Sequence, residues 1–510
     1  MNRFDCLRPT SLAEALALMA PGATETGPSW LAGGQSLLAA MKLGMATPSV
    51  LVDLQDVPGL REIRVETGPD GRPALWLGAM ATHASIAASA VVRRFAPGLA
   101  ALAGGIADAQ VRNMGTIGGS LAHNDPAACW PTGVLAAGAT VVTSRRAIAA
   151  DDYFQGLYST ALTVGELIVG VRFPQPKGLH YLKFEQPASR FALVGVAVAC
   201  PGGEPRAARV AVTGLGSGVV RWHAAEQALA AGFGLAALQP LADAAAAGGA
   251  PGKSLGECLG LEALGDLHAS ADYRCHVTLV LARRCVAALT GEALPPPAPL
   301  VPLAPIVPLA PSTKPSPAAP VAAGPGDTPR DGFGGQQSLP ALPGQVWQAI
   351  LDPRHLQASI PGCEALAQHS PTAYEATVKV GLGPLSVRFK SEVTLRDLQP
   401  PTALTLVFVG QAGALGSGEG TARVRFEPAA DGGTQLHWWV QVQLGGRLAQ
   451  FGNRLVEASA RKLSEEFFER FGAVLPAADG MAPPVATARK LSAWRRLRHA
   501  LARWFPFFGK

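Results

Sequence analysis

Cysteine is scarce in this chain of 510 residues, and its spacing excludes several kinds of site. The seven cysteines stand far apart, without a C-x-x-C pair or the close set that ferredoxins use for a cluster. Iron–sulfur clusters and structural zinc ions need several thiolates that converge on one point. An odd number of scattered cysteines is typical of reduced thiols in a cytoplasm. We therefore expect a cytoplasmic protein in which this chain alone binds no metal.

Long apolar runs are also missing. No stretch of about 18 uncharged apolar residues is present to span a bilayer, and we expect no secretory signal because the N-terminus lacks its apolar segment. Charged residues make up only 16% of the chain, and the net charge is +6. At roughly 100 to 200 residues per domain, this length predicts three to five units.

Glycine, by contrast, is concentrated in two short stretches. The longer one, residues 112–126, contains Gly115, Gly118 and Gly119 beside small hydroxyl residues. Exposed backbone N–H groups in such a loop can closely approach a phosphate or a flavin edge. Taken alone, the stretch is equally consistent with a plain turn.

The second glycine stretch, Gly33-Gly34-Gln35-Ser36, lies upstream. Residues 30–32 before it predict a strand, and residues 37–43 after it predict the start of a helix. A strand, a glycine turn and a helix direct free N–H groups and the positive helix end at a phosphate. The stretch is not a P-loop, since no Lys-Ser or Lys-Thr follows, and it lacks the G-x-G-x-x-G of a dinucleotide turn.

The surrounding residues predict mixed helices and strands. Ser11 and Glu14 have the spacing of a capping box that starts a helix, and Pro21-Gly22 ends it. Thr82 is a candidate N-cap of a further helix. Strands are expected at residues 50–54, 62–65, 74–77, 140–143 and 166–173, with a turn at Pro69-Asp70-Gly71 inside the one hairpin.

These motifs together resemble the FAD-binding medium subunit of the molybdenum hydroxylases, as found in carbon monoxide and xanthine dehydrogenases. The resemblance rests on residues 31–38, the strand with Asp53, and residues 115–119 followed by Asp125-Pro126-Ala127-Ala128. Two such loops in the right order are far more specific than either alone. The resemblance extends to the helix opened by Asp272-Tyr273-Arg274 and covers residues 1–292.

The resemblance implies an α+β fold of the vanillyl-alcohol oxidase type, with two FAD-binding subdomains in residues 1–176 and a C-terminal flavoprotein domain in residues 177–292. It implies FAD as the cofactor, with residues 32–36 on the pyrophosphate side and the second loop along the flavin and ribityl chain. The cofactor-binding residues implied in this way are Ala32, Gly33, Gly34, Gln35, Ser36, Thr116, Gly118, Gly119, Ser120, Asn124, Asp125 and Lys183.

Two residues depart from the family's pattern. Ser120 stands where the family often has asparagine, and Cys129 stands where it usually has aspartate. A thiol accepts hydrogen bonds poorly, so we expect weaker or rearranged FAD binding, by on the order of 1 to 3 kcal/mol. No catalytic residue is assigned. The isolated histidines His83, His123 and His223 are interpreted as structural or solvent-facing.

The composition changes sharply after Glu292. Residues 293–334 are rich in proline, alanine, valine and leucine, with a proline at every third position from Pro299 to Pro311. Such a segment favours polyproline II and forms no core, so we interpret it as a semi-rigid tether. A ligand for an SH3-type domain is the alternative.

Residues 335–476 predict a further domain, with a helix over 343–351, five strands between residues 374 and 444, and a long helix over 447–475. Ile360-Pro361-Gly362-Cys363 and the run 445–450 resemble the G-subunit family of carbon monoxide dehydrogenase, within the START-like superfamily. The resemblance implies a helix-grip cup with an apolar cavity, and a role in membrane anchoring or quinone handling. A simply filled core is the alternative.

The tail, residues 487–510, contains seven lysines and arginines and no acidic residue. Leucines and aromatic residues fall at helical spacing on the opposite face. Such a helix lies in the interface of an anionic membrane, and nothing else in the chain resembles a nucleic-acid module. The predicted membrane contacts are Arg489, Lys490, Trp494, Arg495, Arg496, Arg498, Leu501, Trp504 and Phe505.

The whole pattern predicts a flavoprotein oxidoreductase subunit that is active only with its partners. Electrons would come from a [2Fe-2S] small subunit, after hydroxylation of the substrate by a molybdopterin-containing large subunit, and leave to a quinone or NAD. We expect a peripheral position on the inner face of the cell membrane and no nucleic-acid partner. The alternative is a non-enzymatic membrane adaptor whose flavin site has degenerated, which Ser120 and Cys129 keep open.

Overall fold

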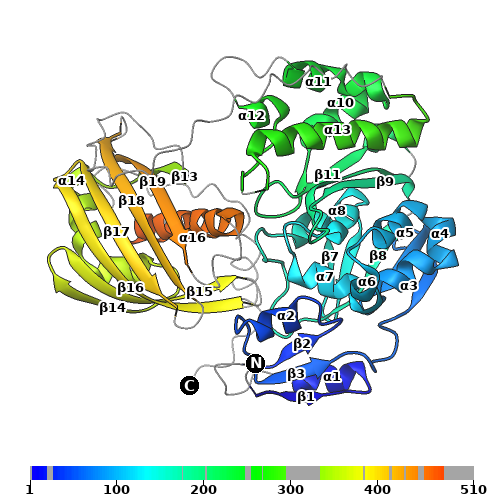
Figure 1. Cartoon of the computed structure of the whole chain (residues 1–510), viewed down its shortest axis with the longest axis horizontal. Coiled ribbons are helices and arrows are strands. Elements are labelled where there is room, and N and C mark those ends of the chain that lie inside the picture. Colours follow the sequence, from blue (N-terminus) through cyan, green and yellow to red (C-terminus); the bar gives the residue numbers. More distant parts are fainter. Residues whose placement is uncertain are drawn as a thin grey trace, which may run out of the picture.

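The computed structural model describes residues 3–19, 27–174, 176–201, 204–246, 254–266, 268–294, 333–382, 385–412, 416–429, 432–445 and 453–475. The elements up to residue 290 and those from residue 333 onward form separate bodies (Figure 1). Within the described residues, the first body contains three sheets and the second contains one.

A small parallel sheet opens the chain. Its strands are β1 (Asp5–Leu7), β2 (Ser29–Leu31) and β3 (Val50–Asp53), in the order β1-β3-β2. Parallel neighbours need crossover connections, and α1 (Leu12–Leu18) and α2 (Leu37–Lys42) lie in them. The predicted N-cap of α1 is confirmed, because the Ser11 hydroxyl accepts from the Glu14 N–H at 3.2 Å, but the Glu14 carboxylate accepts from the Thr10 N–H at 2.7 Å and not from the Ser11 N–H that a capping box requires. The predicted helix end at Pro21-Gly22 lies outside the described residues.

A five-stranded antiparallel sheet follows. Its strands, in the order β4-β5-β8-β6-β7, are β4 (Ile63–Thr67), β5 (Pro73–Gly78), β8 (Ile168–Pro174), β6 (Thr140–Thr143) and β7 (Ala147–Ala149). The helices that accompany it are α3 (His83–Ala88), α4 (Ala90–Phe95), α5 (Pro97–Gly104), α6 (Ala109–Met114), α7 (Ile117–His123), α8 (Cys129–Ala136) and α9 (Ala150–Tyr153). Buried side chains of Trp130, Tyr153 and Phe173 belong to the core between them. The predicted hairpin β4–β5 and the Thr82 cap are confirmed.

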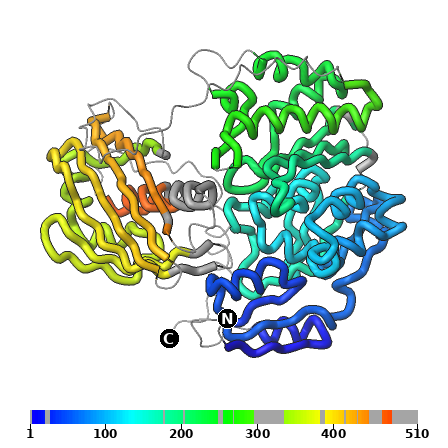
Figure 2. Tube along the Cα trace, viewed as in Figure 1, coloured from blue at the N-terminus to red at the C-terminus, as the bar shows by residue number. Residues whose placement is uncertain are grey.

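The third sheet of the first body is antiparallel, in the order β12-β11-β10-β9. Its elements are β9 (Pro176–Glu185), β10 (Ala192–Pro201), η1 (Pro205–Ala207), β11 (Arg209–Thr213), β12 (Val220–Arg221), α10 (His223–Ala231), η2 (Leu235–Leu238), α11 (Gln239–Ala246), α12 (Leu255–Leu259) and α13 (Ala271–Thr290). Arg274 of α13 is 1% exposed and donates to the Gly214 carbonyl at 2.8 Å and to Asp266 at 2.6 Å. The five-stranded part lies between the blue N-terminal sheet and this green third part (Figure 2).

The second body is a seven-stranded antiparallel sheet with helices. Its strands, in the order β13-β19-β18-β17-β16-β15-β14, are β13 (Phe333–Leu339), β19 (Thr434–Leu444), β18 (Ser417–Pro428), β17 (Ala403–Gln411), β16 (Leu385–Gln399), β15 (Ala373–Leu382) and β14 (Cys363–Ser370). Its helices are α14 (Pro343–Leu351), α15 (Pro353–Ser359) and α16 (Asn453–Val474). Trp347, Phe426, Trp438, Phe468 and Phe471 share one buried core between sheet and helices.

The Asp352-Pro353 pair ends α14 as predicted, but it also begins α15, which the sequence pattern does not predict. The Asp352 carboxylate accepts from the Arg354 N–H at 2.8 Å, and Pro353 is the first helical residue. Proline is favoured there because its missing N–H would have no helical partner. Residues 447–452 of the predicted long helix lie outside the described residues.

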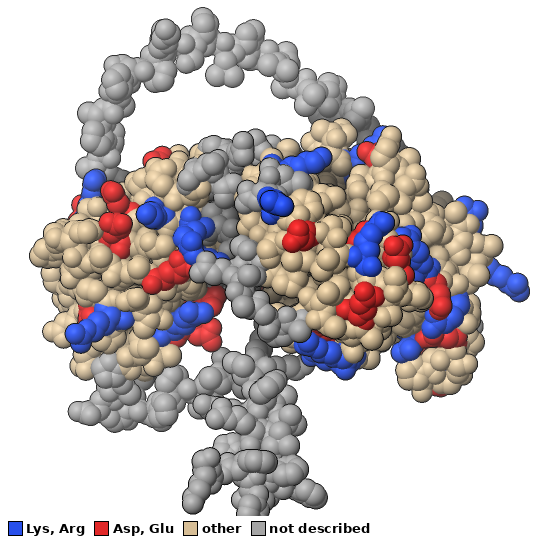
Figure 3. Space-filling model, turned by 90° about the horizontal axis from the view of Figure 1, so that it is seen from below, with Lys and Arg blue, Asp and Glu red and all other residues tan. Residues whose placement is uncertain are grey.

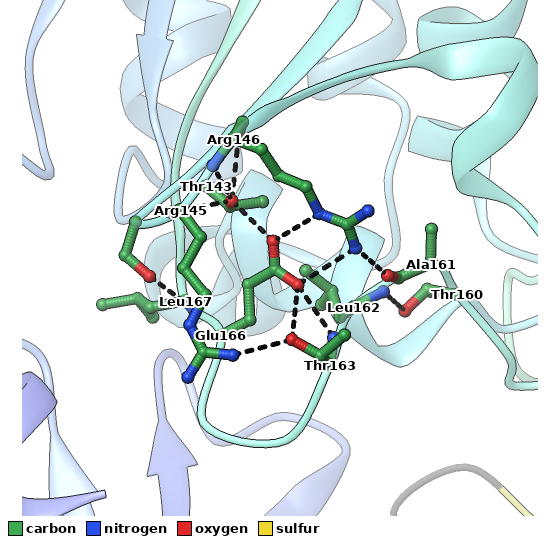
Figure 4. A network of polar contacts seen from close by, with 10 residues as sticks. Thr143, Arg145, Arg146, Thr160, Ala161, Leu162, Thr163, Glu166 and Leu167 are labelled. Atoms are coloured by element: carbon green, nitrogen blue, oxygen red, sulfur yellow. Dashed lines mark hydrogen bonds and ion pairs between the residues drawn. The ribbon is translucent and has the colours of Figure 1, made fainter. Parts of the chain in front are cut away.

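A buried carboxylate fixes the turn that leads into β8. Glu166 is 3% exposed, and it accepts hydrogen bonds from Arg146 Nε at 3.0 Å, Thr143 Oγ1 at 2.7 Å and the Thr163 N–H at 2.8 Å (Figure 4). Burial alone would raise the pKa of Glu166, but these donors outweigh it and lower the pKa from the usual 4.5 to about 2. The charged form of Glu166 therefore stabilises this turn.

We predict that Glu166→Gln lowers the free energy of unfolding of the first body by about 2 kcal/mol at pH 7, the size of a charged hydrogen bond. Because the folded pKa lies below the unfolded one, this contribution is fully present above about pH 5 and disappears as the pH falls toward 2. Urea unfolding at pH 7 and pH 3 measures it. Glu62→Gln, which changes a carboxylate that is 55% exposed, is the matched control. A difference of equal size at both pH values would contradict this assignment.

Candidate functional site

One cavity of about 830 Å³ lies where the three parts of the first body meet. Its lining includes residues 32–36 after β2, residues 115, 116 and 118–120 around the start of α7, and residues 188–191 between β9 and β10. This volume is within the range of about 300 to 1,000 Å³ that small-molecule sites occupy. The two glycine stretches that the sequence singles out are therefore parts of one site.

The first glycine stretch forms an open loop between β2 and α2. All five residues from Ala32 to Ser36 line the cavity, and Gly34 has a φ of +71°, which glycine adopts without strain. The Gln35 side chain donates to the Gly33 carbonyl at 3.0 Å and braces the turn. The N–H groups of Gly33 and Gly34 donate to no acceptor among the described residues. This loop therefore offers backbone donors to a bound anion.

The second glycine stretch uses its N–H groups internally. Gly118 donates to the Ala79 carbonyl at 2.9 Å, Gly119 donates to Thr116 Oγ1 at 3.1 Å, and Ser120 donates to the Thr116 carbonyl at 3.0 Å. The prediction that this loop offers free N–H groups is wrong at these three positions, because Gly119 and Ser120 bond within the first turn of α7 and Gly118 bonds to the segment after β5. Its glycines serve close packing, since a Cβ atom on Gly118 would lie 2.6 Å from the Ala79 Cβ.

The two loops touch through backbone atoms. A Cβ atom on Gly33 would lie 2.0 Å from the Met114 carbonyl oxygen and 2.9 Å from the Gly115 Cα. Real Cβ atoms do not approach backbone that closely, so any other residue at position 33 would push the loops apart. Ala32 and Gly119 are neighbours at the same contact, where a Cβ atom on Gly119 would lie 3.4 Å from the Ala32 Cβ.

The far wall is a loop tied down by Asn124, which caps α7 with a φ of +48°. The Asn124 amide donates to the carbonyls of Gly156 at 2.8 Å and Ser159 at 2.7 Å. Tyr158 of that loop donates to Asp125 Oδ2 at 3.2 Å, and its ring lies 4.9 Å from the His123 ring. Tyr158, Asp125 and His123 line the cavity, whereas Asn124 stands behind it at 1% exposure.

Backbone strain is concentrated at this cavity. Among the described residues other than glycine, five have a positive φ, and Ala107, Tyr158 and Arg190 of these line the cavity. The Arg112 guanidinium holds one strained segment by donating to the carbonyls of Ile106 at 2.8 Å and Ala107 at 2.7 Å. Strained backbone persists only where surrounding contacts hold it, and it is often found at functional sites.

Lys183, like Asn124, is an implied cofactor-binding residue that lies outside the cavity lining. Its ammonium donates to the Arg190 carbonyl at 2.7 Å and pairs with Glu185 at 3.3 Å. It thereby supports the segment 188–191, which does line the cavity. The other implied residues that line it are Ala32, Gly33, Gly34, Gln35, Ser36, Thr116, Gly118, Gly119, Ser120 and Asp125.

The two departures from the family pattern both lie in the cavity wall. Cys129 begins α8 and is 6% exposed, and burial raises the pKa of its thiol although Lys183 and Tyr181 oppose the shift. The thiol is therefore neutral near pH 7 and brings no negative charge to this wall.

Two histidines interpreted from the sequence as structural or solvent-facing also line the cavity. His83 is 5% exposed, and burial, reinforced by the Arg112 charge, lowers its pKa to about 4. Burial likewise lowers the pKa of His123, against the charge of Asp125. No periodicity or motif in the sequence distinguishes them. His223, in contrast, is 70% exposed and pairs with Glu226.

The described residues contain no group of three or more histidine, cysteine, aspartate or glutamate side chains that could hold a metal ion. Within the same residues, no helix combines the length and apolar character needed to cross a membrane. The predicted membrane contacts in residues 487–510 lie outside the part of the chain that the structure describes.

Comparison with known proteins identifies the families to which the two parts of the chain are similar. A family model described as the FAD binding domain in molybdopterin dehydrogenase matches residues 2–176, and the model of CoxG, the G subunit of carbon monoxide dehydrogenase, matches residues 335–475. The nicotine 6-hydroxylase medium subunit of Paenarthrobacter nicotinovorans is 38% identical over 285 residues, covering 54% of this chain and 94% of the relative. The carbon monoxide dehydrogenase medium chain of Afipia carboxidovorans is 35% identical, covering 57% of this chain and 98% of the relative. A solved carbon monoxide dehydrogenase from Hydrogenophaga pseudoflava is 35% identical, covers 57% of this chain and 98% of that one, and has a TM-score of 0.49.

Fold and site thus define a flavoprotein oxidoreductase subunit with FAD as its cofactor. The chain belongs to the FAD-binding medium subunits of the molybdenum hydroxylases, and it also contains a CoxG domain. Both resemblances found in the sequence are confirmed. The cavity fits the cofactor, because free backbone donors at Gly33 and Gly34 suit a pyrophosphate.

We predict that Gly33→Ala weakens FAD binding at least tenfold, because the added methyl group collides with the Met114 carbonyl rather than with a movable side chain. Quenching of FAD fluorescence by the apoprotein measures the dissociation constant. Gly27→Ala is the control, since a Cβ atom there meets nothing within 4 Å. Equal affinities for the two variants would contradict the role of the loop contact.

Proposed function

We propose that this chain is the electron-transfer subunit of a molybdenum hydroxylase. Its FAD would take electrons from a [2Fe-2S] small subunit, supplied in turn by a molybdopterin-containing large subunit, and pass them to a quinone or NAD. The main support for this proposal is that residues of both glycine loops line the same cavity. In support, the relatives are named as medium subunits of a nicotine 6-hydroxylase and a carbon monoxide dehydrogenase.

We further propose that residues 1–176 form a two-subdomain FAD-binding fold of the vanillyl-alcohol oxidase type and that residues 177–292 form the C-terminal flavoprotein domain. Residues 293–334 would be the tether, 335–476 the START-like domain and 487–510 the membrane-binding tail. The parallel sheet, the five-stranded sheet and the four-stranded sheet support the first two divisions.

FAD supplies the one- and two-electron chemistry when it is bound. The chain's own residues bind and orient it. The free N–H groups of Gly33 and Gly34, with the hydroxyl of Ser36, suit the pyrophosphate. Ser120 and Asp125 would contact the flavin and the ribityl chain. Asn124 and Lys183 would act indirectly, because their hydrogen bonds to the Gly156 and Arg190 carbonyls hold segments of the cavity wall in place.

The metal and flavin content of the purified complex tests this proposal. The full chain, tagged and isolated from its own cells, should bring down molybdenum and iron together with FAD, measured by metal analysis and flavin absorbance. An untagged strain is the control. A chain that carries FAD but neither metal would contradict the proposed place in a molybdenum hydroxylase, and a colourless chain that stays so after added FAD would instead favour the adaptor.

We also propose that the CoxG domain and the tail place the enzyme on the inner face of the cell membrane, near a quinone. The seven basic residues of the tail exceed the net charge of +6 of the whole chain, so the other residues together are slightly acidic. In agreement, basic and acidic side chains are interspersed over the face shown in Figure 3. Electrostatic attraction to anionic lipid therefore depends on the tail.

Deletion of residues 487–510 should abolish flotation of the full chain with anionic vesicles, since each basic residue near such a surface contributes about 1 kcal/mol. A milder variant, Arg495→Gln with Arg496→Gln, should float partially and only at low salt. Vesicles of neutral lipid are the control. Equal flotation of the intact and shortened chains would remove the tail from the proposal.

A further inference from the structure

His83 begins α3, directly beside the contact between the two glycine loops. Its backbone N–H donates to the Gly115 carbonyl at 2.9 Å, and Thr82 before it forms a bridge with Thr116. These bonds place the imidazole next to the second loop. At 5% exposure the side chain is buried in protein except toward the cavity that it lines.

One ring nitrogen of His83, Nδ1, already accepts a hydrogen bond within the protein. The buried Trp130 indole donates its N–H to Nδ1 of His83 at 3.0 Å. An indole nitrogen can only donate, so Nδ1 must be an unprotonated acceptor. The proton of the neutral ring is therefore on Nε2. Since the pKa is lowered to about 4, the ring stays neutral near pH 7.

The other nitrogen, Nε2, has no hydrogen-bond partner among the described residues. A Cβ atom on Gly115 would lie 2.8 Å from Nε2, so the glycine keeps the space beside this nitrogen open. Gly115 in turn lies against Gly33, the start of the loop with free backbone donors. Nε2 therefore faces the cavity at the junction of both loops, where its N–H can donate to an acceptor oxygen of a bound ligand.

We propose that His83 is a cofactor-binding residue whose Nε2–H, oriented by Trp130, donates past Gly115 to an acceptor oxygen of FAD where the two loops meet. The inference rests on the proposed function, because it needs FAD in this cavity. A neutral donor with a fixed tautomer orients an oxygen without adding a charge that would depend on pH.

The first test compares FAD dissociation constants of the full-length apoprotein. Asparagine reaches the position of Nδ1 and can accept from Trp130, but it has no atom at the position of Nε2. His83→Asn should therefore weaken FAD binding about five- to tenfold, the range for one neutral hydrogen bond. Glutamine carries an amide nitrogen near the position of Nε2, so His83→Gln should stay within about threefold of the natural chain.

His180→Asn is the matched control, because His180 is a half-buried histidine of β9 that does not line the cavity. Its affinity should be unchanged. Natural affinity in His83→Asn, or an equal loss in the asparagine and glutamine variants, would overturn the inference and leave His83 as a partner of Trp130 only. A natural chain that binds no FAD would refute the proposed function instead.

The second test reads the tautomer directly. In nitrogen NMR spectra of the full chain labelled at histidine, the signals absent from His83→Gln identify this ring. They should show a proton on Nε2 at pH 7, and added FAD should move the Nε2 signal more than the Nδ1 signal. A proton on Nδ1, or signals that FAD leaves unmoved, would overturn the inference.

Discussion

The site depends on one backbone contact, the approach of Gly33 to the Met114 carbonyl and the Gly115 Cα. This contact connects the parallel sheet to the helices of the five-stranded sheet, and the cavity lies along the junction. Because neither partner is a movable side chain, the spacing is set by the absence of a Cβ atom. The strained segments at Ala107 and Tyr158 line the same cavity, and hydrogen bonds from Arg112 and Asn124 hold them in place.

The two loops differ in whether their backbone N–H groups are free to bind a ligand, although both are rich in glycine. The first loop leaves N–H groups free, whereas the second uses its own to start α7 and to pack on Ala79. The second loop therefore contributes shape, the Ser120 hydroxyl and the neighbouring side chains of His123 and Asp125. Cys129 contributes a neutral thiol to this wall, because burial raises the pKa of that thiol.

Much of the fold could be predicted because its signals are local. The Ser11 and Thr82 caps, the β4–β5 hairpin and the strand before Gly33 each follow from residues within a few positions of one another. The pairing of the loops came from resemblance to a family, since no local rule links Gly33 to Gly115. The roles of His83 and Glu166 could not be predicted, because their partners Trp130 and Arg146 lie 47 and 20 residues away. Helix α15 was not predicted because an Asp-Pro pair is also typical of a helix end.

The most direct test of the central claim is titration of the full-length apoprotein with FAD, followed by flavin fluorescence and absorbance. The two-loop cavity predicts saturable binding of one FAD per chain, with the flavin held tightly enough to survive gel filtration. Absence of saturable binding in the folded natural chain would contradict the role of this cavity, and it would leave the membrane adaptor with a degenerate flavin site as the better description.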